Sequence, residues 1–360
     1  MIPSAAARCT IAALAVCALC PTANAQTWPD RPVKLIVNFP PGGVADTLAR
    51  GIAPGIQEAI KQPVVVENRA GANGSIGADV VAKAPPDGYT FLVTSGGAMT
   101  VDPFLYANLP YDTQKDLKPV AALAIVRVFL MINSSVPAKN LNEFIAYARA
   151  NPGKLAYASA GSGSSPHLAG EMFARAAKIQ ATHVPYKGAA PALNDLLGGQ
   201  VQFMFDPGPG LQHVATGKLV VLGVASGKRP SRYPDIPTLA ELGIPVDADT
   251  TFGVYAPAGV SPAIVERMNK EITRTLNSPA LVESMAKLGG DVAPMTISEF
   301  VSRQAADRAR APQPYAPGSP CSPGWPWPPC WRPAVRPSPL RARSRRPRPR
   351  RHRELARAAG

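Results

Sequence analysis

Cysteine is missing from the main part of the chain. Residues 21–320 contain none, because the five cysteines are Cys9, Cys17, Cys20, Cys321 and Cys330. This distribution excludes a thiol nucleophile, a cysteine zinc site and an internal disulfide framework from that part. Histidine is scarce there as well, and no two histidines stand four residues apart, as a helical metal site requires. We therefore predict no metal site and no cofactor.

One end of the chain contains no lysine and almost no acidic residues. Residues 308–360 hold 13 arginines and one acid, Glu354, a net charge of +12 within a total of +14. The same segment contains 13 prolines, which disfavour helices and central strands. A polybasic arm that binds polyanions is one interpretation of residues 311–360. A frameshifted, disordered Pro/Arg-rich tail is the interpretation we favour. Because the rest of the chain is nearly neutral, we predict no nucleic-acid partner.

No apolar run reaches the roughly 20 residues that span a bilayer. The run at residues 10–20 follows Arg8 and precedes Ala23-Asn24-Ala25, which has the pattern of an export-signal cleavage site. The sequence thus predicts a signal peptide over residues 1–25, a mature chain that begins at Gln26, and a periplasmic location.

Between residues 33 and 310, apolar segments of strand length alternate with helical ones. Residues 33–39 form a buried-strand pattern, and the helix after them repeats apolar residues every four positions from Val44 to Ile60. The further strands that we expect are 64–67, 89–94, 120–132, 155–159, 182–186, 201–205 and 219–225, and the helices are 141–150, 166–177, 190–197 and 262–276. This alternation predicts an α/β fold with parallel-type sheets, and its length favours two lobes.

Two glycine loops follow predicted strands. The first is Pro40-Pro41-Gly42-Gly43, where backbone N–H groups and a helix N-terminus would attract an anion. An ordinary strand-to-helix turn is the alternative. No Gly-Lys-Ser/Thr follows the loop, so it is not a nucleotide P-loop.

The second glycine loop covers residues 158–167 and is rich in serine. It offers hydroxyl and backbone donors to a carboxylate. A secreted serine hydrolase that uses residues 159–165, with His167 or His183 as base, is the competing hypothesis. The G-x-S-x-G elbow is absent, because Ala160 stands where its first glycine would be.

Eleven segments, in order, resemble the extracytoplasmic solute receptors of the tripartite tricarboxylate transporter family, the Bug receptors. They include Phe39-Pro40-Pro41-Gly42-Gly43 and His183-Val184-Pro185-Tyr186-Lys187-Gly188. The segments are 28–46, 62–71, 74–77, 86–90, 109–112, 152–159, 167–171, 183–188, 190–200, 234–238 and 256–259.

The resemblance implies a type II periplasmic binding protein fold and no enzymatic activity. Lobe 1 would hold residues 28–123 and 252–310, and lobe 2 residues 124–251, with crossings near 121–127 and 250–255. The lobes would close on a small carboxylate: a di- or tricarboxylate, an acidic amino acid or an aromatic acid. A monomeric receptor would then deliver this ligand to membrane transporter subunits.

The resemblance also implies a set of ligand-binding residues in both lobes. They are Phe39, Pro41, Gly42, Gly43, Val44, Asp46, Thr94, Ser95, Gly96, Ser159, Ala160, Gly161, Ser162, Gly163, Ser164, His167 and Asp206. For Asp206 two roles remain open, contact with a ligand amine or a cap in a turn. The family's C-terminal helix is expected to start near Ser298 and to stop near Arg310, where the tail begins.

Overall fold

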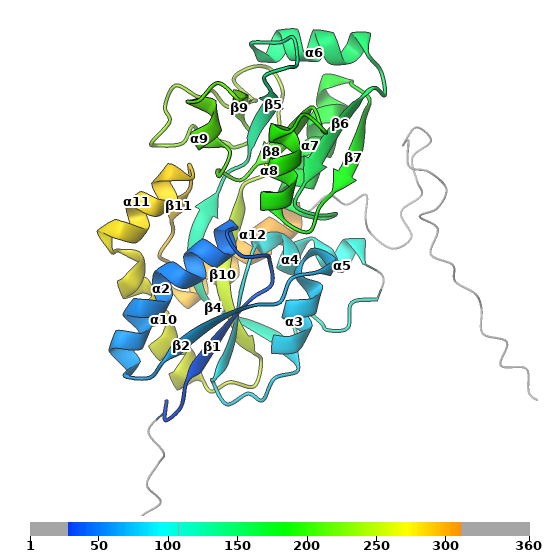
Figure 1. Ribbon diagram of the computed structural model, residues 1–360. Helices are drawn as coiled ribbons and strands as arrows, with labels where there is room; N and C mark the ends of the chain where they lie inside the picture. Colours follow the sequence, from blue (N-terminus) through cyan, green and yellow to red (C-terminus); the bar gives the residue numbers. More distant parts are fainter. Residues whose placement is uncertain (1–27, 107, 311–360) are drawn as a thin grey trace, which may run out of the picture. The chain divides into compact units, whose positions relative to one another are not determined.

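The computed structural model describes residues 28–106 and 108–310, all within one compact unit, and contains two β-sheets with helices packed on them (Figure 1). The predicted signal peptide, its cleavage site and the predicted Pro/Arg-rich tail lie outside the described residues. Within the described ranges, no helix is long and apolar enough to cross a membrane.

The first sheet has six strands in the order β11-β4-β10-β3-β1-β2. Its strands are β1 (Val33–Val37), β2 (Val64–Asn68), β3 (Thr90–Thr94), β4 (Leu117–Val126), β10 (Thr250–Pro257) and β11 (Asp291–Val292). Strand β1 pairs in parallel with β2 and β3, whereas β10 runs antiparallel to β3 and β4.

The second sheet has five strands in the order β7-β6-β8-β5-β9. Its strands are β5 (Phe129–Asn133), β6 (Leu155–Ser159), β7 (Ala181–Pro185), β8 (Phe203–Asp206) and β9 (Leu219–Val224). Strand β6 is parallel to β7 and β8, and β5 is antiparallel to β8 and β9. We call each sheet with the helices packed on it a lobe, the first being six-stranded and the second five-stranded.

Both sheets are mixed, because the chain passes from one sheet to the other and later returns. The apolar segment 120–132, expected as one strand, is interrupted at Arg127 and Val128, so that β4 belongs to the first sheet and β5 to the second. The returning strand β10 pairs with β4, with Thr250 opposite Val126. A strand that returns must run against the strand that left, which adds antiparallel pairs to the expected parallel ones.

Eight longer helices and several short ones connect the strands in the described ranges. The longer ones are α2 (Val44–Ile60), α3 (Ser75–Ala82), α6 (Leu141–Ala150), α7 (Ser165–Ala177), α8 (Ala189–Leu197), α10 (Pro262–Leu276), α11 (Pro279–Lys287) and α12 (Ile297–Arg310). The short ones are α4 (Gly96–Thr100), α5 (Asp102–Leu105), α9 (Leu211–Val214) and the 3-10 turn η1 (Ala72–Gly74).

The apolar repeat of helix α2 positions the N-terminus of this helix beside the first glycine loop. Leu48, Ile52 and Ile56 are fully buried, and they pack with β1 and with α10, which lies beside α2 (Figure 1). The helix ends where Lys61 adopts a left-handed conformation. Burial of this stripe holds the N-terminus of α2 at the end of β1, where the first glycine loop lies.

Candidate functional site

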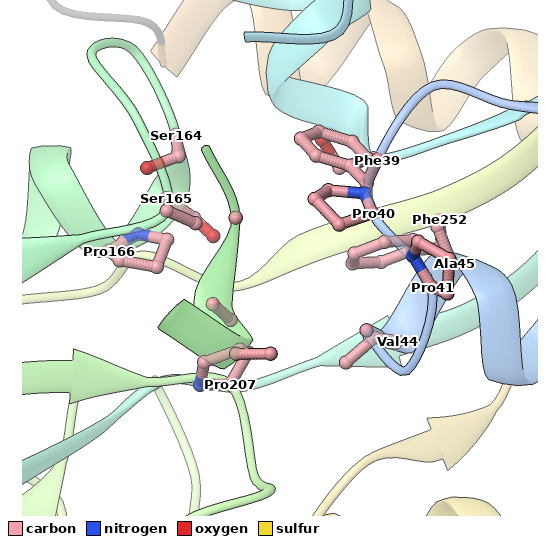
Figure 2. Close-up of a pocket in the computed structure, with 16 residues that line it drawn as sticks. Phe39, Pro40, Pro41, Val44, Ala45, Ser164, Ser165, Pro166, Pro207 and Phe252 are labelled. Atoms are coloured by element: carbon pink, nitrogen blue, oxygen red, sulfur yellow. The ribbon is translucent and has the colours of Figure 1, made fainter. Parts of the chain in front are cut away.

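Loops from both lobes surround one small cavity, which we call cavity 1, with a volume of about 50 Å³. Figure 2 shows Ser164, Ser165, Pro166 and Pro207 on one side of it and Phe39, Pro40, Pro41, Val44, Ala45 and Phe252 on the other. The lining residues are Phe39, Pro40, Pro41, Gly43, Val44, Ala45, Ser95, Ala160, Ser164, Ser165, Pro166, Gly188, Ala189, Ala190, Pro207 and Phe252.

Three helices begin at cavity 1. The first residues of α2, α7 and α8 all line it, and the preceding residues Gly43, Ser164 and Gly188 make no capping hydrogen bond through a side chain. The first N–H groups of a helix have no partner within the helix, and each N-terminus carries about half a positive charge. Cavity 1 therefore attracts an anion without any lysine or arginine in its wall.

Asp46 stabilises the first glycine loop. Its carboxylate accepts hydrogen bonds of 3.0 Å from the N–H of Gly42, from Nε of Arg50 and from Nδ2 of Asn68. Burial alone would raise the pKa of Asp46, but these hydrogen bonds outweigh it and hold that pKa below its usual value. Asp46, predicted as a ligand residue, is 4% exposed, is not among the residues that line cavity 1, and bonds to its own loop.

His167 stabilises the second glycine loop through a hydrogen bond to its backbone. Its Nδ1 accepts a 3.1 Å hydrogen bond from the N–H of Gly163, and its ring stacks on that of His183 with the centroids 4.1 Å apart. Burial lowers the pKa of His167 to about 4, so the ring is neutral at neutral pH, as an accepting Nδ1 requires. His167, predicted to contact the ligand, lies outside the cavity wall.

The serines of this loop are largely engaged with its own backbone. Ser164 Oγ donates to the carbonyl oxygen of Gly161 at 2.6 Å. Ser159 Oγ lies 2.7 Å from Nε2 of His183, a serine–histidine contact of the kind that a hydrolase uses. However, Ser159 is fully buried, also accepts from the N–H of Gly161, and does not line cavity 1. The geometry gives the hydrolase hypothesis no accessible nucleophile at this pair.

Asp206 holds the turn that brings Pro207 to cavity 1. Its Oδ1 accepts from the N–H groups of Gly208 and Gly210, both at 2.7 Å. Burial raises the pKa of Asp206 to about 6, although these two hydrogen bonds act against that rise. Asp206 therefore stabilises this turn, and its contact with a ligand amine stays a prediction.

The structure brings some of the 17 predicted residues together and not others. Those that line cavity 1 are Phe39, Pro41, Gly43, Val44, Ser95, Ala160 and Ser164. Those that line neither cavity are Gly42, Asp46, Thr94, Gly96, Ser159, Gly163, His167 and Asp206. The remaining two, Gly161 and Ser162, line the second cavity described next. Which of them touch a ligand stays a prediction.

A second cavity of about 240 Å³, cavity 2, lies next to the first and shares Phe39, Pro40 and Ala160 with it. The hydroxyl of Tyr106 donates to the carbonyl of Ser162 at 3.1 Å and so joins the two lobes there. The lining residues of cavity 2 are Asn38, Phe39, Pro40, Gly71, Ala72, Gly74, Tyr106, Ala160, Gly161, Ser162, Pro185, Tyr186 and Lys187.

Sequence reasoning missed the third helix N-terminus. Gly188, Ala189 and Ala190 follow strand β7 and begin α8, so they repeat the strand–glycine–helix pattern that marked the first loop. That pattern could have identified them. Phe252 carries no such signal, since it belongs to the returning strand β10.

Comparisons with known proteins agree with this architecture. Residues 48–311 match the family described as "Tripartite tricarboxylate transporter family receptor". The chain is 41% identical to the protein BugT of Bordetella pertussis, in an alignment that covers 74% of this chain and 82% of that protein.

Two solved structures are similar over most of their length. The periplasmic binding protein BugD is 34% identical, with a TM-score of 0.73, and the match covers 78% of this chain and 96% of BugD. The R. palustris protein Rpa4515, solved with adipate, is 34% identical, with a TM-score of 0.76 and coverage of 79% and 95%. These likenesses confirm the predicted periplasmic binding protein fold. The chain belongs to the receptor family of the tripartite tricarboxylate transporters, as the order of its motifs indicated.

Proposed function

We propose that this receptor captures a small carboxylate in cavity 1, in the periplasm, and delivers it to the membrane subunits of a tripartite transporter. The observation that carries the proposal is that α2, α7 and α8 all begin at one cavity. Backbone N–H groups at helix N-termini bind carboxylates well, because the helix dipole and the free donors act together.

The similar R. palustris protein was solved with adipate, a dicarboxylate. This supports a carboxylate as the ligand class here, at 34% sequence identity. Binding, rather than turnover, is the role that follows. Both walls of cavity 1 come from one chain, so a monomer is sufficient to bind the ligand.

Closure of the two lobes is the motion we infer for capture. The walls of cavity 1 come from both lobes, so a ligand that contacts both favours the closed state over the open one. The passages at Arg127–Val128 and just before β10 are where the lobes would rotate.

Thermal unfolding in the presence of small carboxylic acids tests the proposal. A ligand at 100 times its Kd adds about 2.7 kcal/mol to the free energy of unfolding and raises Tm. Ala190→Asp places a carboxylate at the second residue of α8, in the wall of cavity 1, and we expect it to abolish this rise.

The matched control is Val282→Asp, which adds the same charge at a residue of α11 that is 41% exposed and lines neither cavity. It should keep the full rise in Tm. An equal rise in the Ala190→Asp variant, or no rise with any acid in the wild type, would contradict carboxylate binding in cavity 1.

A further inference from the structure

Gly208 of the second lobe packs directly against the first lobe. A Cβ at this position would clash with the backbone carbonyl oxygen of Leu288. Leu288 follows α11, whose Leu281 and Met285 belong to the core of the first lobe. Pro207, the residue before Gly208, lines cavity 1 (Figure 2). The contact with Leu288 therefore determines how closely the wall formed by Pro207 approaches the first lobe.

Gly188 and Gly97 make two further contacts between the lobes. A Cβ on Gly188 would lie 2.8 Å from Cδ of Pro40, and both of these residues line cavity 1. On Gly97, in α4 of the first lobe, a Cβ would lie 3.4 Å from the carbonyl oxygen of Gly163 in the second lobe. Ser164, next to Gly163, also lines cavity 1. All three contacts thus lie at the cavity wall or beside it, and at each of them the lobes approach closely because one residue has no side chain.

The groups that attract an anion lie on both sides of cavity 1. The N-terminus of α2 belongs to the first lobe, and those of α7 and α8 belong to the second. Each N-terminus presents backbone N–H groups and partial positive charge. A ligand with two carboxylates can therefore meet helix N-termini of both lobes. The separation of the lobes then determines which ligand length fits.

We infer that the contacts of Gly97, Gly188 and Gly208 set the width of cavity 1 and so select the ligand by its length. The inference rests on the proposed function and adds the structural basis of its size selection. Atoms in ordinary contact lie about 3.5 Å apart, so a methyl group at Gly208 holds the lobes about 1 Å further apart. The groups of a binding site must lie within about 0.5 Å of their productive positions. A separation of this size therefore moves the preference to a longer ligand.

Isothermal titration calorimetry of the purified protein with unbranched dicarboxylates tests this inference. The acids from malonate to sebacate differ only in the number of methylene groups between their two carboxylates. We expect the wild type to bind one length most tightly. Gly208→Ala should bind that acid about tenfold or more weakly, and its tightest ligand should be longer by at least one methylene group.

The matched control is Gly243→Ala. Gly243 also has a positive φ, 84° compared with 121° for Gly208, but a Cβ there would have no neighbour within 4 Å, and the residue does not line cavity 1. This variant should keep the length preference of the wild type. Gly97→Val adds bulk towards Gly163 at a residue that does not have a positive φ. It should show the same shift to longer acids, and it decides if Gly208→Ala does not fold.

The outcomes separate this inference from the proposed function. If the wild type binds dicarboxylates without a length preference, or if the variants keep its preference, the inference is wrong while carboxylate capture stands. An equal loss of affinity for every length in the variants also overturns it, because a merely damaged site gains no new optimum. If the wild type binds no acid of the series, the inference fails. If monocarboxylic acids then also leave Tm unchanged, the proposed function fails with it.

Discussion

Gly188, immediately before α8, is a residue where the two lobes approach each other closely. Its φ is 130° and its ψ is 170°, a conformation that is nearly restricted to glycine. A Cβ there would lie 2.8 Å from Cδ of Pro40 in the first lobe. We expect Gly188→Ala to reduce the free energy of unfolding by about 1–3 kcal/mol, by the cost of the conformation. It should also weaken ligand binding, because the N-terminus of α8 and Pro40 must move apart.

The control for this prediction is Gly217→Ala. Gly217 also has a positive φ, 71°, but a Cβ there would have no neighbour within 4 Å, and the residue lines neither cavity. Denaturant unfolding should show a cost of about 1–2 kcal/mol for this variant. Calorimetry with a bound acid should show unchanged affinity for Gly217→Ala and reduced affinity for Gly188→Ala. Equal affinities would contradict the role given to the contact with Pro40.

His167 and His183 make the free energy of unfolding depend on pH. Burial lowers the pKa of His167 to about 4, and burial followed by the charge of His167 lowers the pKa of His183 to about 3, both from 6.5. The unfolded chain therefore binds protons below pH 6.5 that the folded chain does not. This contribution to stability is fully present above about pH 6.5 and is lost as pH falls towards about 4.

Denaturant unfolding at a series of pH values measures this dependence. His167→Asn retains an acceptor for the N–H of Gly163 but does not titrate. We expect its free energy of unfolding to fall less steeply than that of the wild type between pH 6.5 and 4. Identical slopes would show that His167 does not contribute to the acid sensitivity.

At the scale of single elements, helix α12 tests how the end of the described chain contributes to the fold. Phe300 is fully buried and packs on Tyr255 of β10, with the ring centroids 5.5 Å apart. Its neighbour Val301 is 47% exposed. Phe300→Ala should cost about 3–5 kcal/mol, since it removes a buried aromatic ring, whereas Val301→Ala should cost less than about 0.5 kcal/mol. Similar losses in urea unfolding of the two variants would mean that α12 is not docked through Phe300.

Elements with their own local signals were predictable from the sequence. Helices α6 and α10 have the expected bounds, and each begins after a residue whose side chain caps it: Asn140 accepts from the N–H of Glu143, and Ser261 from that of Ile264. The apolar pattern did not predict the break at Arg127, because the apolar run continues on both sides of it; only the family resemblance placed a crossing near residues 121–127. Pairing with distant strands, rather than local pattern, decides where β4 ends.

The sequence predicted which loops form the candidate site, but not which way their polar side chains face. A polar residue in a glycine loop can face a ligand or its own backbone, and the local sequence is the same in both cases. Asp46 and Asp206 face their own loops, and His167 supports Gly163. Only the packed structure separates the residues that line cavity 1 from those that position them.

For the whole molecule, the question is what holds the lobes together around a ligand. The hydroxyl of Tyr106, which follows α5 in the first lobe, donates to the carbonyl of Ser162 in the second lobe at 3.1 Å. A single hydrogen bond of this kind contributes about 0.5–1.5 kcal/mol. Tyr106→Phe removes that bond with little change in shape, so it destabilises the closed state relative to the open one.

We expect Tyr106→Phe to speed ligand release by about two- to tenfold, since interface changes act mainly on the dissociation rate. The control is Tyr186→Phe, because the hydroxyl of Tyr186 donates to Asp195 of α8 within the second lobe, at 2.6 Å. Stopped-flow measurement of dissociation should give the wild-type rate for Tyr186→Phe and a faster rate for Tyr106→Phe. If the two variants release ligand at the same rate, the bond between Tyr106 and Ser162 does not contribute to closure, and the lobes are held by the ligand and by the strands that join them.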